Sequence, residues 1–333
     1  MSDIDRIVGW LLGRDPRATP TKARLETLLA RYAEKGLKDA LGGAPREGPS
    51  GGECLAIESF LPVSLSFPDV RSAKEAFLSE LRLLFGIGCA RDHDLRQEGY
   101  KSIPSLLGHP RWCEAAASLI EDWGSPLDAE RVHETLSTWL PTSHPLFLQL
   151  LALVSPAEAL FLDLETLGLG GAPVFLAALG RPEGDGIHVT QYLARSLEEE
   201  VPLLEQVGAE IAVSSILLTY NGKAFDWTTL VERSAYYGVS LPRPPVHVDL
   251  LHHARRAFRD RLNDVRLGTV EAELLHVRRL DDLPSEDVPE HYATYLETGN
   301  PGPLVPVVRH NRQDVGSLAL LLSRLLWQAD HGR

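Results

Sequence analysis

The sequence predicts an α/β protein: a mixed β-sheet flanked by helices, preceded by a mostly helical N-terminal region. From about residue 155 onward, apolar runs of strand length alternate with amphipathic helical stretches. Within this part, VFLAALGRPEGDGIHVTQYL reads as two strands around a glycine-rich turn. Such alternation produces parallel strands, and the one early hairpin adds antiparallel strands to them. The sheet is therefore expected to be mixed.

Composition divides the chain into four segments. Residues 1–41 are predicted to be helical, because TKARLETLLARYAEKGLKDAL carries Leu and Ala at helical spacing. Residues 42–52, GGAPREGPSGG, are predicted to be a flexible linker. Residues 53–152 begin with the strand-like ECLAIESFLPVSLSF and are otherwise mostly helical. Residues 153–333 are expected to form the α/β domain.

The elements of this domain follow one another in a regular order. EALFLDLETL is an apolar strand, and after the hairpin LEEEVPLLEQVGAEI is an amphipathic helix. SILLTYN is a buried type of strand, and AFDWTTLVERSAYYG is again helical. PPVHVDLLHHARRAF predicts a short strand running into a helix, and the last long helix is expected to start near Val307.

Composition also limits the classes of function. The 333 residues are 44% hydrophobic and carry a net charge of −13, which argues against nucleic-acid binding by electrostatic attraction alone. A metal site built from carboxylates would account for part of the acidity. The three cysteines, Cys54, Cys89 and Cys113, show no C-x-x-C pairing, so a reduced cytoplasmic setting is expected. The sequence shows neither a secretory signal nor a membrane span, so no membrane partner is expected.

A first acidic motif, LDLETLG, contains Asp163 and Glu165. On a strand these two side chains point to the same face, because the side-chain period is two. Neighbouring carboxylates at the end of a sheet repel each other unless a cation lies between them. Taken alone, the pair also fits an exposed acidic turn.

Two later motifs carry further acids. Asn221 and Gly222 form a turn signal after a strand, which puts Asp226 in the first turn of a helix. Alone, Asp226 also fits a helix-start acid that the helix dipole favours. His310 and Asp314 lie four residues apart near the start of the last helix, so their side chains share a face. That pair also fits a histidine and a surface acid without a catalytic role.

The order of the three motifs is more specific than any one of them. D-x-E on the first strand, N-x-x-x-F-D after a later strand and H-x-x-x-D on the last helix resemble the DEDD exonucleases, the DnaQ-like branch of the ribonuclease H-like fold. The chain is most similar to the YprB-type ribonuclease H-like domain over roughly residues 155–330. The resemblance rests on FLDLETLGL, TYNGKAFDW, VDLLHHARR, LGTVEAELL and HNRQDV.

This resemblance implies a 3′→5′ exonuclease that hydrolyses single-stranded DNA or RNA. Its four acids would be Asp163, Glu165, Asp226 and Asp314, a hard oxygen donor set that suits two Mg²⁺ or Mn²⁺ ions. In two-metal chemistry one ion lowers the pKa of the attacking water, and both stabilise the charge on phosphorus. His310 would be the general base, since the ordinary pKa of histidine is about 6.5.

The same resemblance suggests where the substrate lies. The backbone from Thr166 to Gly168 would approach the terminal nucleotide, where glycine leaves room, and Leu167 would wedge against its base. Further expected substrate contacts are Asn221, Phe225 and Arg309.

One position departs from the family pattern. Histidine-type members place His five residues before the acid, whereas tyrosine-type members place Tyr four residues before it. This chain has His310 at the tyrosine spacing from Asp314. The sequence therefore leaves two interpretations of His310 open: general base, or bystander beside a metal ligand.

A weaker resemblance lies in the N-terminal half. FGIGCARDHDLRQEGYKSIPSLLGHP resembles a helix-hairpin-helix over 85–107, with Gly86 and Gly88 in a turn whose amides would hold a phosphate. The alternative is a packing unit in which the turn only joins two helices. Arg255 and Arg256 lie in the basic run ARRAFRDR and are expected either to contact phosphates or to form a solvated helix face.

The sequence leaves two rivals to the nuclease. One is a catalytically silent nucleic-acid-binding protein on the same fold, and the other is an interaction module whose acids form a structural ion site. The presence of all five expected groups favours the nuclease. The choice between DNA and RNA stays open, because no motif encodes recognition of the 2′-OH.

Overall fold

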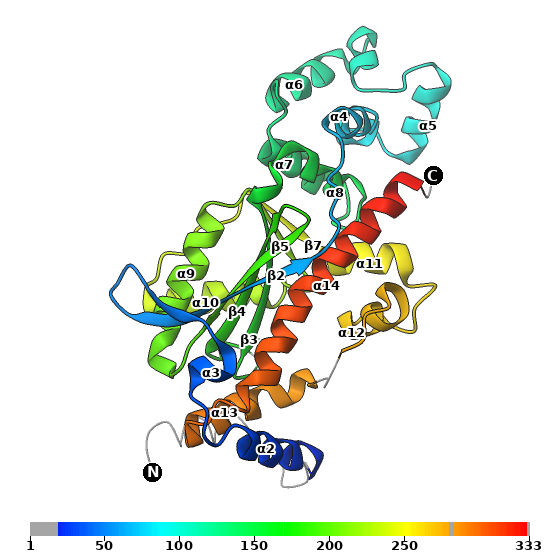
Figure 1. The fold of residues 1–333 in the computed structure, drawn as a ribbon. Helices are drawn as coiled ribbons and strands as arrows, with labels where there is room; N and C mark the ends of the chain where they lie inside the picture. The colour runs from blue at the N-terminus through cyan, green and yellow to red at the C-terminus, as the bar shows by residue number, and fades with distance from the viewer. Residues whose placement is uncertain (1–18, 169, 280–282, 332–333) are drawn as a thin grey trace.

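The computed structural model describes residues 19–168, 170–279 and 283–331. Its centre is a seven-stranded mixed sheet of order β1-β2-β5-β4-β3-β6-β7 (Figure 1). The neighbours from β1 to β3 are antiparallel, whereas β3, β6 and β7 are parallel, which confirms the predicted mixed sheet. The strands are β1 (Ala44–Glu47), β2 (Glu53–Pro62), β3 (Ala159–Thr166), β4 (Val174–Glu183), β5 (Gly186–Leu193), β6 (Ile216–Thr219) and β7 (Val246–Asp249).

Helices cover both faces of this sheet. Helices α9 and α10 pack on one face, and the long helix α14 crosses the other face beside α11 (Figure 1). The connection between α11 and α14 contains α12, a π-helical turn and α13. The bounds are α9 (Glu200–Ala212), α10 (Asp226–Tyr237), α11 (Leu250–Phe258), α12 (Leu267–Val270), the π-helical turn (Glu271–Leu275), α13 (Val288–Thr298) and α14 (Leu304–His331).

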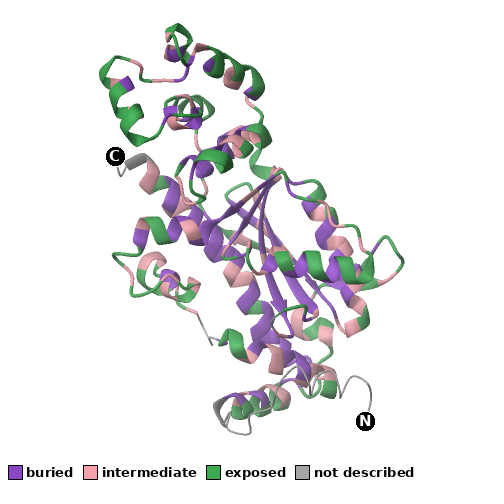
Figure 2. Ribbon diagram, turned by 180° about the vertical axis from the view of Figure 1, so that it is seen from behind, coloured by how far each residue is buried: buried purple, intermediate pink, exposed green. Residues whose placement is uncertain are grey.

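Strand β3 shows how side-chain alternation separates two cores. Leu160, Leu162 and Leu164 enter the core under α9, whereas Phe161 enters the core under α14. Because successive side chains alternate, Asp163 and Glu165 continue the row of Phe161 toward α14. Figure 2 shows the sheet and the inner side of α14 as the most buried part of the molecule. The two acids are therefore carried on a strand that is buried on both faces.

Helix α14 approaches the sheet closely because β4 has a glycine below it. A Cβ at Gly180 would lie 2.6 Å from Cγ1 of Val315, a separation that real Cβ atoms essentially never show. The glycine thus fixes the depth of the turn of α14 that follows Asp314. The position of the catalytic candidates on α14 depends on this contact.

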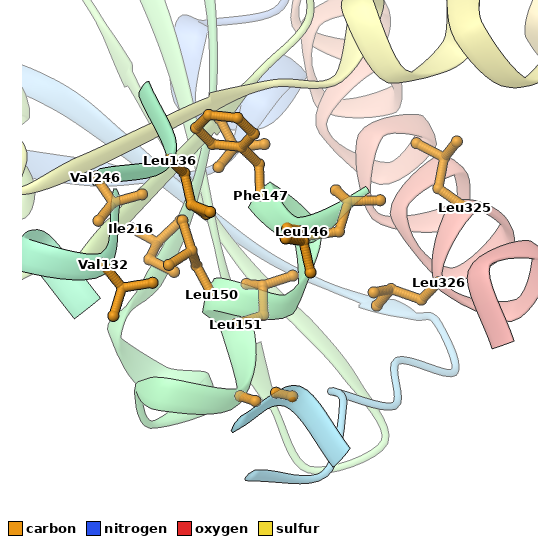
Figure 3. Close-up of a cluster of buried hydrophobic side chains, with 14 of the residues drawn as sticks. Val132, Leu136, Leu146, Phe147, Leu150, Leu151, Ile216, Val246, Leu325 and Leu326 are labelled. Carbon is orange, nitrogen blue, oxygen red and sulfur yellow. The ribbon is translucent and has the colours of Figure 1, made fainter. Parts of the chain in front are cut away.

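The helical region between β2 and β3 shares a core with the sheet. It contains α4 (Val70–Leu78), α5 (Cys89–Gln97), α6 (Cys113–Trp123), α7 (Ala129–Trp139) and α8 (Leu146–Gln149), with short 3₁₀ turns between them. Leu136 of α7, Phe147 of α8 and Leu150 pack against Ile216 of β6, and the same cluster reaches the last turns of α14 (Figure 3). This region covers the end of the sheet at which β3, β6 and β7 begin.

Two sequence predictions about domain limits need correction. Residues 42–52 are not a flexible linker: β1 pairs with β2 along its whole length, and the Gly48 amide donates to the Gly52 carbonyl at 2.7 Å. The hairpin also rests on α9, where Gln206 Nε2 donates to the Glu47 carbonyl at 2.9 Å. The glycines serve a tight turn rather than flexibility, with Gly51 at φ +90°. Strands β1 and β2 precede residue 153 yet belong to the sheet, so the predicted boundary at 153 divides one sheet.

Most of the other predicted helices and strands agree with the structure, whereas the helix-hairpin-helix over 85–107 stays a prediction: the 3₁₀ turn Leu81–Leu83 precedes Gly86, and α5 follows it. Helices α2 (Thr19–Arg31) and α3 (Leu37–Leu41) occupy part of the predicted helical segment 1–41, of which residues 1–18 lie outside the described residues. The last long helix begins at Leu304, close to the expected Val307. Across the described ranges, every helix is too short or too polar to span a bilayer.

The shared core gives a test of the fold. Leu150→Ala removes a fully buried side chain between the helical region and the sheet, and should lower the free energy of unfolding by about 2–5 kcal/mol. Val213→Ala, at a position 68% exposed, is the control and should change it by less than about 0.5 kcal/mol. Urea unfolding followed by tryptophan fluorescence measures both. Equal midpoints for the two variants would contradict a shared core.

Candidate active site

Four acids from three elements meet at one end of the sheet. Asp163 and Glu165 lie near the carboxyl end of β3, Asp226 is the first residue of α10, and Asp314 lies on the third turn of α14. Strands β3, β6 and β7 are parallel, so their carboxyl ends share one edge, where α10 and α11 also begin. The structure therefore brings together all four predicted metal ligands.

The electrostatics of the acids reflect burial and mutual repulsion. Burial raises the pKa of Asp163 well above its ordinary value, and the charge of Asp226 raises it further. The pKa of Glu165 is raised by burial and then by Asp163, Asp314 and Asp226. The pKa of Asp314 is raised by burial and then by Asp163. Each acid thus makes ionisation of the next one harder, as expected for carboxylates that share a dry site.

Asp226 is buried where α10 begins next to β3. It begins α10 directly after the turn at Asn221, and its Oδ1 accepts a hydrogen bond from the Leu164 amide of β3 at 3.1 Å. Burial raises its pKa to about 7, although this hydrogen bond lowers it. One oxygen is therefore tied to the strand that carries the other two acids.

Asn311 and Gln191 hold Asp163 in place. Asn311 Nδ2 donates to Oδ2 of Asp163 at 2.8 Å, and its own Oδ1 accepts from Gln191 Nε2 at 2.9 Å. Gln191 Nε2 also donates to the Val308 carbonyl of α14 at 2.9 Å. Gln191 and Asn311 are fully buried, so these hydrogen bonds connect β5, α14 and β3 in the interior of the protein. Sequence reasoning missed both residues. Asn311 lies three residues before Asp314, on the same face of the helix, and this spacing was the available signal.

Arg279 is paired with Asp314, the acid that α14 contributes to the cluster. Its Nη2 donates to Oδ1 of Asp314 at 2.6 Å, and its Nε donates to Glu271, which is 1% exposed. Glu271 also accepts from the Ser317 hydroxyl of α14. Glu271 opens the π-helical turn after α12, an irregularity that is frequent at functional sites. This buried glutamate orients the arginine toward the cluster.

His310 lies beside two of the acids, Glu165 and Asp314, and beside Arg279. Its Nε2 is 3.6 Å from Oδ2 of Asp314 and 4.0 Å from Oε1 of Glu165. Its Nδ1 is 2.9 Å from Nη1 of Arg279. The same Nη1 lies 3.4 Å from Nε2; because a guanidinium only donates, the shorter contact favours Nδ1 as the acceptor and the tautomer with the proton on Nε2, on the side of the acids.

A fifth acid, Asp249, supports the site without belonging to the cluster of four. It caps α11, where its Oδ1 accepts from the Leu251 amide at 3.1 Å. The same oxygen accepts from the Asn221 amide at 2.8 Å, and Oδ2 accepts from the Lys223 amide at 3.1 Å. Asn221 has φ +63°, so the turn that delivers Asp226 depends on these hydrogen bonds. Asp249 is thus the N-cap of α11 and also holds the turn before α10.

The predicted substrate contacts Thr166, Leu167 and Gly168 lie at the end of β3 and directly after it. Thr166 Oγ1 donates to the Gly168 carbonyl at 2.7 Å, and this hydrogen bond holds the backbone in a tight turn beside the acids. Leu167 is 1% exposed and packs in the core under α9. The expectation that Leu167 wedges against a base does not fit this burial and is corrected. Its amide donates to the Pro173 carbonyl at 3.0 Å, so the side chain faces inward as part of the turn.

The remaining predicted contacts fall into two groups. Asn221 and Arg309 are exposed near the cluster, and Phe225 is half-buried beside Asp226. The second group is distant: Gly86 and Gly88 precede α5, at the end of the molecule opposite to α2 and α13 (Figure 1). In that group Arg255 and Arg256 are exposed on α11, and Arg256 lines a separate cavity of about 850 Å³ beside α4. The structure does not bring these four residues to the acids.

The donor chemistry of the site fits a hard divalent cation. Its four acids supply carboxylate oxygens only, the ligands that Mg²⁺ and Mn²⁺ prefer, and their raised pKa values reflect burial and mutual repulsion, both of which a bound cation would offset. Among the residues that the structure describes, no three His, Cys, Asp or Glu side chains are arranged as a ready metal cluster. One oxygen each of Asp163, Asp226 and Asp314 instead accepts a hydrogen bond from the protein.

Two known proteins are similar to parts of this chain. The chain is 40% identical over 166 residues to the uncharacterized protein YprB of Bacillus subtilis (strain 168), covering 48% of this chain and 40% of that protein. It thus spans less than half of that relative. A solved family B DNA polymerase from Pyrobaculum calidifontis matches 52% of this chain and 25% of its own, at 20% identity and a TM-score of 0.42.

A family model identifies the superfamily of this chain. It matches residues 160–326, which contain the four acids and His310, and it describes the RNase H superfamily. This stretch covers β3 to β7 and most of α14. The chain therefore belongs to the RNase H superfamily.

Proposed function

We propose that this protein is a metal-dependent nuclease that removes nucleotides from the 3′ end of single-stranded DNA or RNA. One observation carries the proposal: four buried or half-buried carboxylates from β3, α10 and α14 share one site whose charge the protein compensates only in part. Membership of the RNase H superfamily is consistent with nuclease activity. The direction of attack and the single-stranded substrate rest on the resemblance to DEDD exonucleases.

In this proposal Asp163, Glu165, Asp226 and Asp314 would hold two Mg²⁺ or Mn²⁺ ions. Such ions supply an activated water and stabilise charge on the phosphoryl oxygens. The chain's own contribution is to hold the acids in register, through the Asn311 contact on Asp163 and the Leu164 amide on Asp226. Burial of the site also strengthens every electrostatic interaction within it.

His310 is the proposed general base. A base needs an unprotonated nitrogen directed at the proton that it removes. In this structure the Nδ1 lone pair accepts from Arg279, and Nε2 points toward Glu165 and Asp314. Release of the arginine contact, or a change of tautomer, would free a nitrogen next to the acids. The position of His310 beside the acids therefore supports the role of general base. To accept a proton there, the imidazole must lose its Arg279 contact or change tautomer.

The first test is loss of cleavage. Asp163→Ala and Asp226→Ala should each abolish the Mn²⁺-dependent shortening of a 5′-labelled strand, because both would remove a metal ligand. Asp185→Ala, an exposed acid in the β4–β5 turn, is the matched control and should cleave normally. Binding without cleavage by the wild-type protein would favour the silent nucleic-acid-binding protein. Unchanged digestion by Asp163→Ala would overturn the site.

The second test addresses His310. If it is the base, His310→Ala should lower the rate constant by about 10²–10⁴-fold while the Mn²⁺ concentration for half-maximal activity stays the same. Single-turnover kinetics over a range of Mn²⁺ concentrations separate these two quantities. A near-normal rate constant would mean that His310 only neighbours the ligand Asp314.

The third test uses pH. The pKa of Asp226 is about 7 in the fold and about 3.9 in an unfolded chain, so between these values the folded state binds more protons. This group therefore stabilises the metal-free protein below about pH 4, and the stabilisation is lost as the pH rises through about 7. In EDTA, the melting temperature of Asp226→Asn should fall less than that of the wild type between pH 5 and pH 8. Identical pH profiles would show that Asp226 is not held protonated.

A further inference from the structure

A polar cavity of about 460 Å³ lies next to the four acids. Its walls come from α2 and the first turns of α14. Arg279 and His310 line this cavity and also contact the acids, so the cavity lies next to the acid cluster. Its volume lies within the range of about 300–1,000 Å³ that is usual for ligand sites. Helix α2 precedes the segment 160–326 that matches the RNase H superfamily.

Helix α2 presents one face to this cavity. Arg24, Thr27, Leu28 and Arg31 all line it, at the spacing i, i+3, i+4 and i+7 that places side chains on one face of a helix. The opposite wall is formed by α14, where Arg309 and Gln313 are one turn apart. We call this cavity the α2 pocket. Its sequence signal is the periodic placement of two arginines on a helix outside the α/β part of the chain.

The α2 wall is fixed to the rest of the fold. Asn300 Nδ2 donates to the Leu29 carbonyl at 2.9 Å, and Thr21 Oγ1 donates to Oδ2 of Asp287 at 3.1 Å. A Cβ at Gly302 would lie 2.5 Å from the Leu28 carbonyl oxygen, so the backbones approach as closely as glycine allows. Leu25 is buried on the inner side of the helix. The arginines of α2 are thus presented by a docked element.

The charge of the α2 pocket is opposite to that of the protein. Four arginines line it, Arg24, Arg31, Arg279 and Arg309, of which Arg279 is paired with Glu271 and Asp314; among the described residues that line it, none is Asp or Glu. The chain as a whole has a net charge of −13. A concave patch of one sign next to low-dielectric walls focuses the field and attracts ions of the other sign. Beside a site for phosphodiester hydrolysis, the anion that fits is phosphate.

We propose that the α2 pocket binds the phosphodiester backbone of the strand whose 3′ end lies at the carboxylates. The inference rests on the proposed function for the identity of its substrate, but its test does not require cleavage. A guanidinium presents a planar pair of donors that matches two phosphate oxygens, so several arginines around one cavity can follow a run of phosphates. Arg309, on the wall of α14, continues the pocket to the turn that carries His310.

The test measures binding of a fluorescein-labelled oligothymidylate by anisotropy, with the full chain in EDTA. Arg24→Gln/Arg31→Gln should weaken binding roughly tenfold and reduce the slope of log K against log salt by about 1.4, since each phosphate contact on a single strand contributes about 0.7. Lys22→Gln/Lys38→Gln removes the same charge from exposed positions outside the α2 pocket and should leave the affinity and slope unchanged. Equal losses in the two double variants would overturn the proposal.

Two further arms keep the test decisive. Thr27→Arg adds a cation to the pocket wall at an exposed helix position and should tighten binding, which decides the matter if the double arginine variant fails to fold. Thymidine 5′-monophosphate should compete far more weakly than an unlabelled strand, and equal competition would overturn a strand-binding role. If Asp163→Ala still cleaved, the proposed nuclease site would fail while the binding result would stand unaffected.

Discussion

The burial of four carboxylates in one cluster is the constraint on which the rest of the structure depends. Removing one carboxylate from water is costly, and placing several together adds mutual repulsion, which appears here as raised pKa values. The fold supplies partial compensation at defined atoms: the Asn311 amide on Asp163, the Leu164 amide on Asp226 and the Arg279 guanidinium on Asp314. Gly180 below α14 and the strained turn at Asn221 set the positions of these partners. The negative charge that these partners leave uncompensated makes the site favourable for cations.

Arg279 links this cluster to its surroundings. Oriented by the buried Glu271, it contacts both Asp314 and His310 and also lines the α2 pocket. One guanidinium therefore offsets an acid, holds the lone pair of the proposed base and faces the proposed path of the strand. In this proposal a phosphate entering from the α2 pocket competes with Asp314 and His310 for the arginine. Substrate entry and release of His310 would then be coupled through a single side chain.

Most of the fold was predictable from the sequence because it depends on local pattern. Apolar runs on β3 and β6, the glycine turn between β4 and β5 and the helical spacing of α14 are confirmed. The errors arose where pairing partners lie far apart in sequence: β2 pairs with β5 across more than a hundred residues, and glycines that form the β1–β2 turn resembled a linker. Similarly, the acids were found through motif spacing, whereas Gln191, Asn311 and the burial of Leu167 depend on which strand and helix come into contact. No local pattern encodes those contacts.

The central claim is that the carboxylate cluster binds divalent cations in place of protons. Calorimetric titration of the metal-free protein with Mn²⁺ near pH 6.5, repeated in buffers of different ionisation enthalpy, measures stoichiometry and proton release together. The account predicts two ions bound per chain with net release of protons, because part of the cluster is protonated before the cations bind. Absence of saturable binding, or binding without proton release, would contradict it.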